Sequence, residues 1–555
     1  MKSIYLLLVT LVAPVCTTTC EEVSPFQLPI KDVQVLPNIS ESFMRGISLS
    51  VGTPPQDIVL LPWPELNNTW IYDQQAYCDS SIIWNNVICQ VRRGNYYLEG
   101  NSSTIAKSDD IIAAGGAGTE TQSSGSELGI GKFTTSSLAG TDTFSLNSTT
   151  TLSAAFPFGI PRLSWDHGYT MLHAMGMGTN STFLTTLLQT GRIGSRVWSI
   201  FWGRMWVDDE DAIDGSIVFG GFDQQKTLGK NYTQPLDFSD TTGCWTGMKV
   251  QISKLNLNFR NGDDVDLLPA NTLIDACIVP QRQLLLEAPG TIVQTFEKET
   301  GMESYARSYG LHWSSYLYNT SDLFDGDLTI SLSTGLDIRI PNNQYLVPYV
   351  DIDRNGSRII DTSVRELLVN GLSDQPATLG RYFLTAAYLM VDLDSNTFTL
   401  WQANPTRDSK LVSAAANRAT DSQCVNDTSI PGSNGTASDL SQAPQQANGL
   451  SGGSIAGIVV GVIAGLAVLG LGVFFYLRRA RNGAQFTQSD EATPAMGDQS
   501  RVDQNSGLQH PDSTKQLQAP IHELRGSPAA LSEVSGHHNY VYEMNGDERY
   551  AGRTH

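Results

Sequence analysis

A period-two alternation of apolar and polar residues constrains this chain most, because it recurs in short segments between residues 41 and 405. Examples are "RGISLSV", "SIVFGGF", "MKVQISKLNLNF" and "FTLWQA", bounded by Gly, Asn, Asp or Pro. Successive side chains of a strand point to opposite faces, so this pattern indicates many half-buried strands joined by turns. Two stretches favour helices instead, "STFLTTLLQTG" and the "RQLLLEA" region. At 555 residues, the chain is also too long for a single core.

The two ends of the chain carry apolar runs of different length. Residues 1–20 have the form of a secretory signal, in which Lys2 precedes an apolar run too short to cross a bilayer. Residues 455–477 are uncharged and long enough for a transmembrane helix. Arginines follow this run directly, so the positive-inside rule predicts a cytoplasmic C-terminus. We expect a single-pass protein of the plasma membrane or another secretory membrane, with its ectodomain outside the cell or in the lumen.

The N-x-S/T sequons agree with this topology, because all of them precede the predicted span and glycosylation requires the lumenal side. The predicted glycosylation sites are Asn38, Asn67, Asn101, Asn147, Asn180, Asn231, Asn319, Asn355, Asn426 and Asn434. A net charge of −21 argues against a nucleic-acid partner, because phosphate repels an acidic surface. We expect no cofactor.

The cysteines point to disulfides in an oxidising compartment. Cys78 and Cys89 are close enough in a turn-rich stretch to close a short loop, and Cys244 with Cys277 is a candidate second bridge. The pairing of Cys20 and Cys424 stays open. Neither the cysteines nor the histidines cluster at the short spacing of a zinc site, so no metal is expected.

Composition divides the rest of the chain. Residues 21–40 are expected to form a short leader, and residues 406–454, rich in Ser, Ala, Gln, Asn and Gly, a flexible stalk. Residues 478–555 are too polar to bury a core and are expected to be a disordered cytoplasmic tail. Gly453, Gly457, Gly461 and Gly465 recur every four residues and predict either a face for helix dimerisation or simply the glycine content usual in membrane spans.

Six blocks, in order, resemble landmarks of the pepsin-like aspartic protease family. They are "VGTPPQDIVLL" (Val51 to Leu61), "NTW" (Asn68 to Trp70), "GMGTNSTFLTTLLQTGRIGS" (Gly176 to Ser195), "GSIVFGGFDQQKTLGK" (Gly215 to Lys230), "TLIDACI" (Thr272 to Ile278) and "TLGRYFLTAAYLMVDLDSNTFTLWQA" (Thr378 to Ala403). The resemblance implies a bilobed, mostly antiparallel β fold with a substrate cleft. It divides the chain into an N-terminal lobe, residues 41–230, and a C-terminal lobe, residues 231–405.

The resemblance also implies two catalytic aspartates, one in a D-T/S-G-S/T loop of each lobe. Two carboxylates so close cannot both ionise, so they share a proton and hold one water as acid and base. Counting from "VGTPPQ", the first aspartate position is Trp63, and its loop reads "WPEL", with Glu65 where the turn glycine belongs. The second loop is expected to keep Asp275, but "ACI" replaces its supporting residues.

Two further differences point the same way. The family's flap carries a tyrosine that closes over substrate, yet no tyrosine occurs between Tyr97 and Tyr169, where "GTDTF" resembles the strand after the flap. The segment between the signal and residue 41 holds a single basic residue, Lys31, and is too short for the family's basic prosegment. We expect Trp63 to pack across the cleft floor.

The favoured interpretation is a pseudoprotease whose cleft binds or senses a peptide, polysaccharide or protein. One alternative is an active membrane-anchored aspartic endopeptidase with an unusual site around Asp275. Another is a glycosylated structural component of a cell wall, because the plan of stalk, span and tail is similar to that of fungal surface proteins. Tyrosines in the tail, Tyr540, Tyr542 and Tyr550, would suit trafficking or phosphorylation in a sensor.

Overall fold

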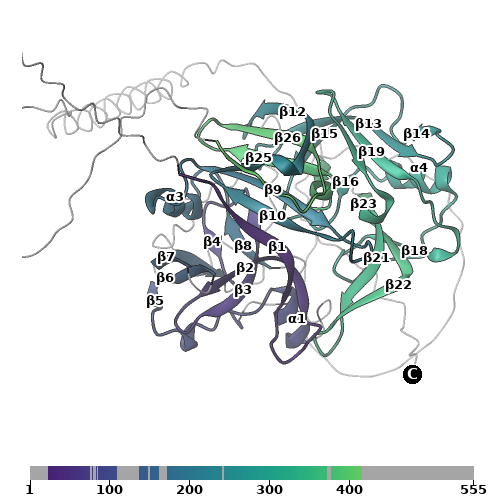
Figure 1. Cartoon of the computed structure of the whole chain (residues 1–555). Helices are drawn as coiled ribbons and strands as arrows, with labels where there is room; N and C mark the ends of the chain where they lie inside the picture. Colours follow the sequence, from purple (N-terminus) through teal and green to yellow (C-terminus); the bar gives the residue numbers. More distant parts are fainter. Residues whose placement is uncertain are drawn as a thin grey trace, which may run out of the picture. The chain divides into compact units, whose positions relative to one another are not determined.

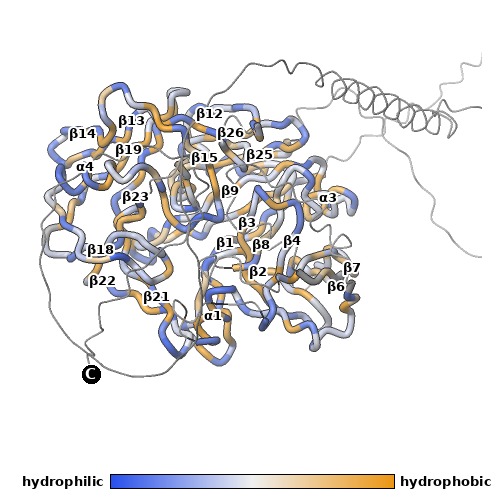
Figure 2. The backbone as a smooth tube through the Cα atoms, turned by 180° about the vertical axis from the view of Figure 1, so that it is seen from behind, coloured by the Kyte–Doolittle hydropathy of each residue, from blue (hydrophilic) through white to orange (hydrophobic). Residues whose placement is uncertain are grey.

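The computed structural model describes residues 23–75, 78, 83, 85–108, 137–147, 150–161, 172–239, 243–371 and 377–414. Strands dominate these residues and arrange themselves as two lobes (Figure 1). Apolar residues run along the strands, and hydrophilic residues gather at many of the turns (Figure 2). The mostly β, two-lobed fold expected from the sequence is therefore confirmed.

The N-terminal lobe is built on a sheet with the order β2-β3-β8-β4-β7-β6-β5. Its strands are β2 (Phe43–Val51), β3 (Gln56–Trp63), β4 (Thr69–Trp70), β5 (Ala106–Ser108), β6 (Ser137–Asn147), β7 (Thr150–Pro161) and β8 (His173–Gly176). The "GTDTF" segment lies in β6, as expected. Most of these pairs are antiparallel, but β3 runs parallel to β8 and β4 runs parallel to β7. The parallel pair of β3 and β8 places the end of β3 at the candidate site.

A central run of strands in the order β12-β26-β25-β9-β10-β1 joins the two lobes. Its members are β1 (Phe26–Gln34), β9 (Val197–Arg204), β10 (Ile213–Phe219), β12 (Thr227–Pro235), β25 (Ala387–Asp392) and β26 (Thr397–Ala403). The antiparallel pair of β9 with β25 is one of the contacts between the halves of the chain. Both strands are almost continuously buried, which is why their sequences, "VWSIFWGR" and "AYLMVD", are apolar with little alternation.

The C-terminal lobe contains two sheets, with the orders β20-β19-β13-β15-β24-β16-β23 and β17-β18-β22-β21, and β14 pairs with β13. The strands are β13 (Lys249–Asn258), β14 (Asp264–Asp266), β15 (Ile274–Ile278), β16 (Leu286–Ala288), β17 (Ala306–Arg307), β18 (Tyr316–Asn319), β19 (Asp327–Leu332), β20 (Asp337–Ile340), β21 (Leu346–Ile352), β22 (Arg358–Leu367), β23 (Val369–Gly371) and β24 (Ala377–Leu379). Here β15 runs parallel to β24, repeating the β3–β8 arrangement of the first lobe.

The α-helices among the described residues are α1 (Asn86–Arg92), α3 (Thr182–Gln189) and α4 (Thr291–Thr300). Short 3₁₀ helices are η1 (Glu99–Asn101), η3 (Gln224–Lys226), η4 (Thr320–Asp322), η5 (Asn342–Gln344) and η6 (Phe383–Thr385). Helix α3 confirms the helix expected in "STFLTTLLQTG". The Ser181 side chain caps it by accepting from the Leu184 N–H at 3.1 Å. The "RQLLLEA" region is not helical but leads into β16, because Leu284, Leu285 and Leu286 are all buried, as in an interior strand.

The folded unit extends beyond the expected lobe boundaries at both ends. Residues 21–40 were expected to be a leader, but β1 lies within them and pairs with both β10 and β2. It does so because Leu28 and Ile30 are buried on one face, while Pro29 and Lys31 are exposed on the other. The expected stalk also begins later than residue 406, because β27 (Leu411–Ser413) pairs with β11 (Gly221–Asp223).

No helix within the described ranges has the length and apolar character needed to cross a membrane. The signal, the predicted span at 455–477 with its glycines, the tail and the cysteines Cys20 and Cys424 lie outside the described residues.

Candidate functional site

The first candidate loop begins where β3 ends. Trp63, the last residue of β3, lies level with Gly176 in the parallel strand β8. The chain then turns, and the Leu66 N–H donates to the Trp63 carbonyl at 3.2 Å. A Cβ on Gly176 would lie 2.4 Å from the Asn68 carbonyl oxygen, so only glycine allows this close approach. The position expected for the first aspartate is therefore held by backbone contacts on both sides.

The Trp63 side chain is completely buried in the main hydrophobic core, with 0 % of its surface exposed. A buried indole contributes a large apolar area to stability and has no acidic proton to exchange near neutral pH. The ring therefore does not face open water, and the expectation that it packs across the cleft floor stays a prediction.

The second candidate loop follows β15 and repeats the geometry of the first. Ile278 pairs with Leu379 in the parallel strand β24, and the Val279 N–H donates to the Leu379 carbonyl at 2.8 Å. The pairing therefore brings Val279 level with Gly380, as Trp63 lies level with Gly176. The Arg282 N–H donates to the Val279 carbonyl at 2.9 Å, which is the counterpart of the bond from Leu66 to Trp63.

A third correspondence fixes the alignment of the two loops. A Cβ on Gly380 would lie 2.3 Å from the Leu284 carbonyl oxygen, and Leu284 is five residues beyond Val279. In the first lobe, the glycine approaches Asn68, which is five residues beyond Trp63. Trp63-Pro64-Glu65 and Val279-Pro280-Gln281 are therefore equivalent segments of the two lobes.

This alignment corrects the placement of Asp275. The sequence analysis expected Asp275 at the second catalytic position, but it lies inside β15, four residues before Val279. There it pairs across the strands with Gln251, whose Nε2 donates to Asp275 Oδ1 at 3.1 Å. Lys249 Nζ lies 2.9 Å from Asp275 Oδ2, and the Asp275 side chain is 43 % exposed. The hydrogen bond from Lys249 holds the pKa of this carboxyl below its ordinary value, although partial burial opposes the shift.

The two loops meet through a side-chain hydrogen bond. Gln281 Nε2 donates to Glu65 Oε1 at 2.7 Å, and these residues hold equivalent places in the two lobes. Gln281 is almost fully buried, at 7 % exposed. At this point the family's motif has glycines, so in this chain two side chains that can bond to each other stand where the motif has none.

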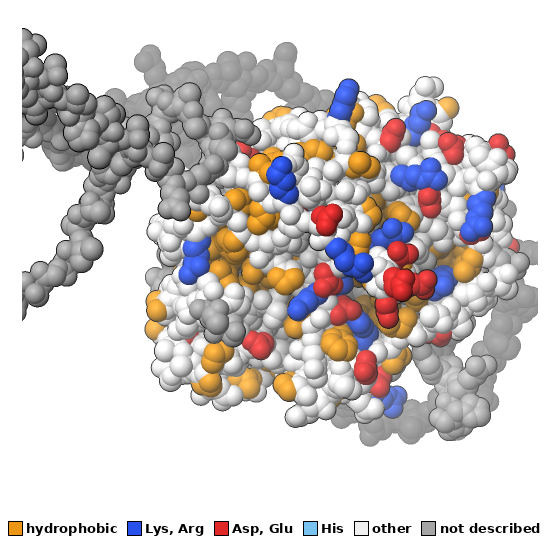
Figure 3. Space-filling model, viewed as in Figure 1, with side chains coloured by type: hydrophobic (Ala, Val, Ile, Leu, Met, Phe, Trp, Pro, Cys, Tyr) orange, Lys and Arg blue, Asp and Glu red, His pale blue; other side chains and the backbone are white. Residues whose placement is uncertain are grey.

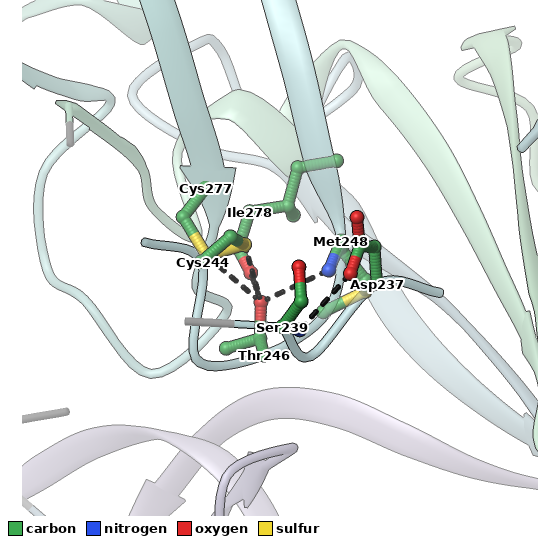
Figure 4. Close-up of a disulfide and its surroundings, with 7 residues drawn as sticks. All are labelled: Asp237, Ser239, Cys244, Thr246, Met248, Cys277 and Ile278. Atoms are coloured by element: carbon green, nitrogen blue, oxygen red, sulfur yellow. Dashed lines mark hydrogen bonds between the residues drawn. A yellow bond between two sulfur atoms is a disulfide. The ribbon is translucent and has the colours of Figure 1, made fainter. Parts of the chain in front are cut away.

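Both disulfides expected from the sequence, Cys78–Cys89 and Cys244–Cys277, are confirmed. The second lies beside the Val279 loop, because Cys277 is in β15 (Figure 4). Thr246 Oγ1 donates to the Ile278 carbonyl at 2.8 Å and so ties the same segment to the end of β15. Figure 4 shows Thr246 between the disulfide and Met248, whose N–H points to the Thr246 hydroxyl. These contacts fix the strand from which the second loop departs.

The sequons differ in exposure. Asn67 is buried, and its Oδ1 accepts from the Asn180 N–H at 2.8 Å. Burial disfavours a glycan on Asn67 in the folded chain, so this site is the one among the described sequons that we expect to be unused. The side chains of the other described sequons are exposed, as a glycan requires: Asn38, Asn101, Asn147, Asn180, Asn231, Asn319 and Asn355. Asn426 and Asn434 lie outside the described residues.

Sequence reasoning missed Val279, Pro280 and Gln281. The signal was present as an internal repeat, because Trp-Pro-Glu and Val-Pro-Gln each follow an apolar strand. Because Asp275 lies nearby, the second loop was aligned with the family motif four residues before Val279. Within the described part of the chain, no group of His, Cys, Asp or Glu is arranged to hold a metal ion.

Known proteins that are similar in sequence to this chain are aspartic proteases. The family model for eukaryotic aspartyl protease matches residues 46–403. Secreted aspartic protease 8 of Candida albicans is 25 % identical over 382 residues, which cover 67 % of this chain and 79 % of the relative. Probable aspartic-type endopeptidase opsB of Aspergillus oryzae is 23 % identical over 394 residues, covering 67 % and 71 %. Aspartic proteinase 3 of Saccharomyces cerevisiae is 23 % identical over 419 residues, covering 64 % and 69 %.

Proposed function

The chain belongs to the eukaryotic aspartyl protease family, and from this premise we propose that it is a catalytically inactive member that acts in binding or sensing. One observation carries the proposal. The two equivalent loop positions hold Trp63 and Val279, and the contact between the loops is the hydrogen bond from Gln281 to Glu65.

The chemistry of the family explains why this arrangement should be inactive. Peptide hydrolysis there requires two carboxylates that share a proton and hold a water between them. An indole and an isopropyl group can neither take up nor release that proton. Trp63 and Val279 are both fully buried, so their side chains fill space instead of holding a nucleophilic water.

Neither nearby carboxylate offers a substitute dyad. Glu65 already accepts the amide of Gln281 and has a neutral amide, not a second acid, facing it. Asp275 is engaged by Lys249 and Gln251 along β15, and its lowered pKa favours a permanently ionised ion-pair partner. A general base near neutral pH would need the opposite shift. These contacts weigh against the alternative of an endopeptidase built on Asp275.

The kept fold supports a binding role. The β9–β25 pair joins the two halves, and most large apolar residues of both lobes are in one core. The proposal includes a peptide, polysaccharide or protein ligand at the cleft. It also includes display of the ectodomain on a secretory-pathway membrane by the segment 455–477. The ligand class is an expectation from the sequence. The membrane anchor is likewise an expectation from the sequence, because residues 455–477 lie outside the described residues.

The test is cleavage of a broad peptide library by the purified full chain, from about pH 3 to pH 7, where aspartic dyads work. Glu65→Gln and Asp275→Asn variants run beside it, since each removes one candidate carboxylate. We expect no cleavage above a heat-inactivated sample in any of the three. Cleavage that Asp275→Asn abolishes would establish the endopeptidase alternative, and cleavage that Glu65→Gln abolishes would establish Glu65 as a catalytic acid or base.

A further inference from the structure

A second feature of the fold is an open cavity of about 660 Å³ beside β1, β9 and β10. Residues of the C-terminal lobe, among them His312 and Tyr382, complete its wall. The described residues that line the cavity include neither Trp63, Glu65, Asp275 nor Val279. The face on which β1 and β10 lie shows Lys and Arg side chains gathered near its middle, with Asp and Glu among them (Figure 3). The cavity is therefore lined by other residues than these candidate site residues, although Arg381 of its lining contacts the second loop at Gln281.

The lining of the cavity is cationic, although the whole chain carries a net charge of −21. The cationic lining residues are Arg45, Arg204, Lys226, Arg358, Arg381 and Arg407, and the acidic ones are Asp32, Asp209 and Asp214. A local excess of positive charge inside a concave surface attracts anions and strengthens their binding, because low-dielectric walls focus the field.

Some of these cations already have carboxylate partners. Arg358 Nη2 donates to Asp32 Oδ2 at 2.8 Å, and Arg45 Nη1 lies 3.8 Å from Asp214 Oδ1. Burial opposes ionisation of Asp32, but the hydrogen bond and charge of Arg358 hold its pKa below the ordinary value. In these two pairs, the positive charge of each arginine is neutralised by a carboxylate of the protein.

Arg381 has no such carboxylate partner among the described residues. It is 8 % exposed, its Nη1 donates to the Gln281 carbonyl at 3.1 Å, and its guanidinium lies 5.5 Å from the centre of the Trp202 ring. No carboxylate among the described residues forms an ion pair with it, and burial lowers the pKa of Arg381 to about 10. A buried charge without a counter-ion is costly, so an anion entering here would recover part of that cost.

Arg204, at the end of β9, is the second unbalanced cation. It forms no hydrogen bond or ion pair through its side chain with any described residue, and its Nε is buried. Arg204 and Trp202 both line the cavity. Arg381 packs on that Trp202 ring. The two guanidinium groups therefore border the same apolar surface, which Met205 and Trp206 extend along the cavity wall.

We propose that this cavity binds a small organic anion, whose carboxylate or phosphate group pairs with Arg204 and Arg381 while its carbon skeleton packs on Trp202 and Trp206. Guanidinium groups suit both head groups, because they form paired hydrogen bonds to two oxygens. The buried Trp surface selects against fully hydrated inorganic ions. The proposal does not depend on whether the loops can cleave a peptide.

Isothermal titration of the purified full chain tests the proposal with three probes of similar size. Phenyl phosphate and benzoate share a ring and differ in head group, and benzyl alcohol has the ring without a charge. We expect saturable binding of at least one anion at concentrations up to about 10 mM, and none of the alcohol. The anion that binds more tightly identifies the head group.

Arg204→Gln is the informative variant, because the side chain makes no hydrogen bond or ion pair with a described residue that the substitution would remove. It should weaken anion binding about tenfold or more, the usual effect of removing one charge-assisted hydrogen bond. Arg260→Gln is the matched control, since Arg260 is 78 % exposed, pairs with Asp325 far from the lining residues and carries the same charge. The proposal fails if the native chain binds none of the anions saturably. It fails equally if Arg204→Gln binds them as well as Arg260→Gln does.

Discussion

Gln281 donates its side-chain amide to Glu65 over 2.7 Å, and these two residues hold equivalent places in loops from opposite lobes. Each of them lies two residues beyond the position expected for a catalytic aspartate, Trp63 in one loop and Val279 in the other. The contact joins a loop of one lobe directly to the equivalent loop of the other.

Loss of the Gln281 amide should destabilise the protein. Gln281→Ala leaves the Glu65 carboxylate without this donor in a nearly buried site, and we expect a loss of about 1–3 kcal/mol in the free energy of unfolding. Urea denaturation measures it. Gln251→Ala is the control, because that amide serves the half-exposed Asp275 and should cost less than about 1 kcal/mol. Equal losses in the two variants would contradict a structural role for the contact between the loops.

Restoring the two aspartates should not restore an enzyme. Trp63→Asp with Val279→Asp removes two fully buried side chains and places two carboxylates in the core. Loss of the ring alone should cost about 3–5 kcal/mol, and burying carboxylates adds to that. We expect a lower melting temperature by circular dichroism and no peptide cleavage. Trp63→Phe, which keeps an aromatic ring, should lose much less stability. A folded double variant that cleaves peptides in acid would show that the loops are still competent.

Asp275 should contribute to stability in a pH-dependent way. Its pKa is lowered in the folded protein, so its contribution is present above the unfolded pKa of about 3.9 and is lost as the pH falls through the lower folded value. Because the side chain is 43 % exposed, the contribution at pH 7 should stay below about 1 kcal/mol. Unfolding of native and Asp275→Asn chains, compared from about pH 7 to pH 3, measures it. A difference that grows on acidification would contradict this assignment.

The sequons should not be used equally. Asn67 is buried and bonded to the Asn180 N–H, so Asn67→Gln should leave unchanged the electrophoretic mobility of the protein expressed through the secretory pathway. Asn319→Gln is the matched variant, because Asn319 is exposed at the end of β18 and can carry a glycan. Its loss should increase mobility by one step. A mobility step for Asn67→Gln would mean that the loop after Trp63 is open when the chain is glycosylated.

The fold could be predicted from sequence because its signals are local and repeated. Alternating strands and six ordered blocks each needed only neighbouring residues to be recognised, and Trp63 followed from a short count along β3. β1 was missed because only Leu28 and Ile30 of its nine residues are buried, so its apolar pattern is weak.

The site could be predicted only in its first half, for a physical reason. The register of β15 is set by its pairing with β24, about a hundred residues later, and not by the residues around Asp275. A parallel pairing leaves no mark in either strand alone. Only after Ile278 is seen beside Leu379 does Val279 emerge as the partner of Trp63, and the bond from Gln281 to Glu65 depends on both lobes at once.

The pairing of β9 with β25 also determines when the sheet can be completed during synthesis of the chain. Strand β9 is synthesised almost two hundred residues before the strand that covers it, since Leu389 pairs with Ile200. Until then an apolar edge stays unpaired, and such edges invite aggregation in a nascent chain. This edge of β9 is therefore paired only when the end of the second lobe has been synthesised. A chain stopped before residue 387 would lack β25, the strand that pairs with β9.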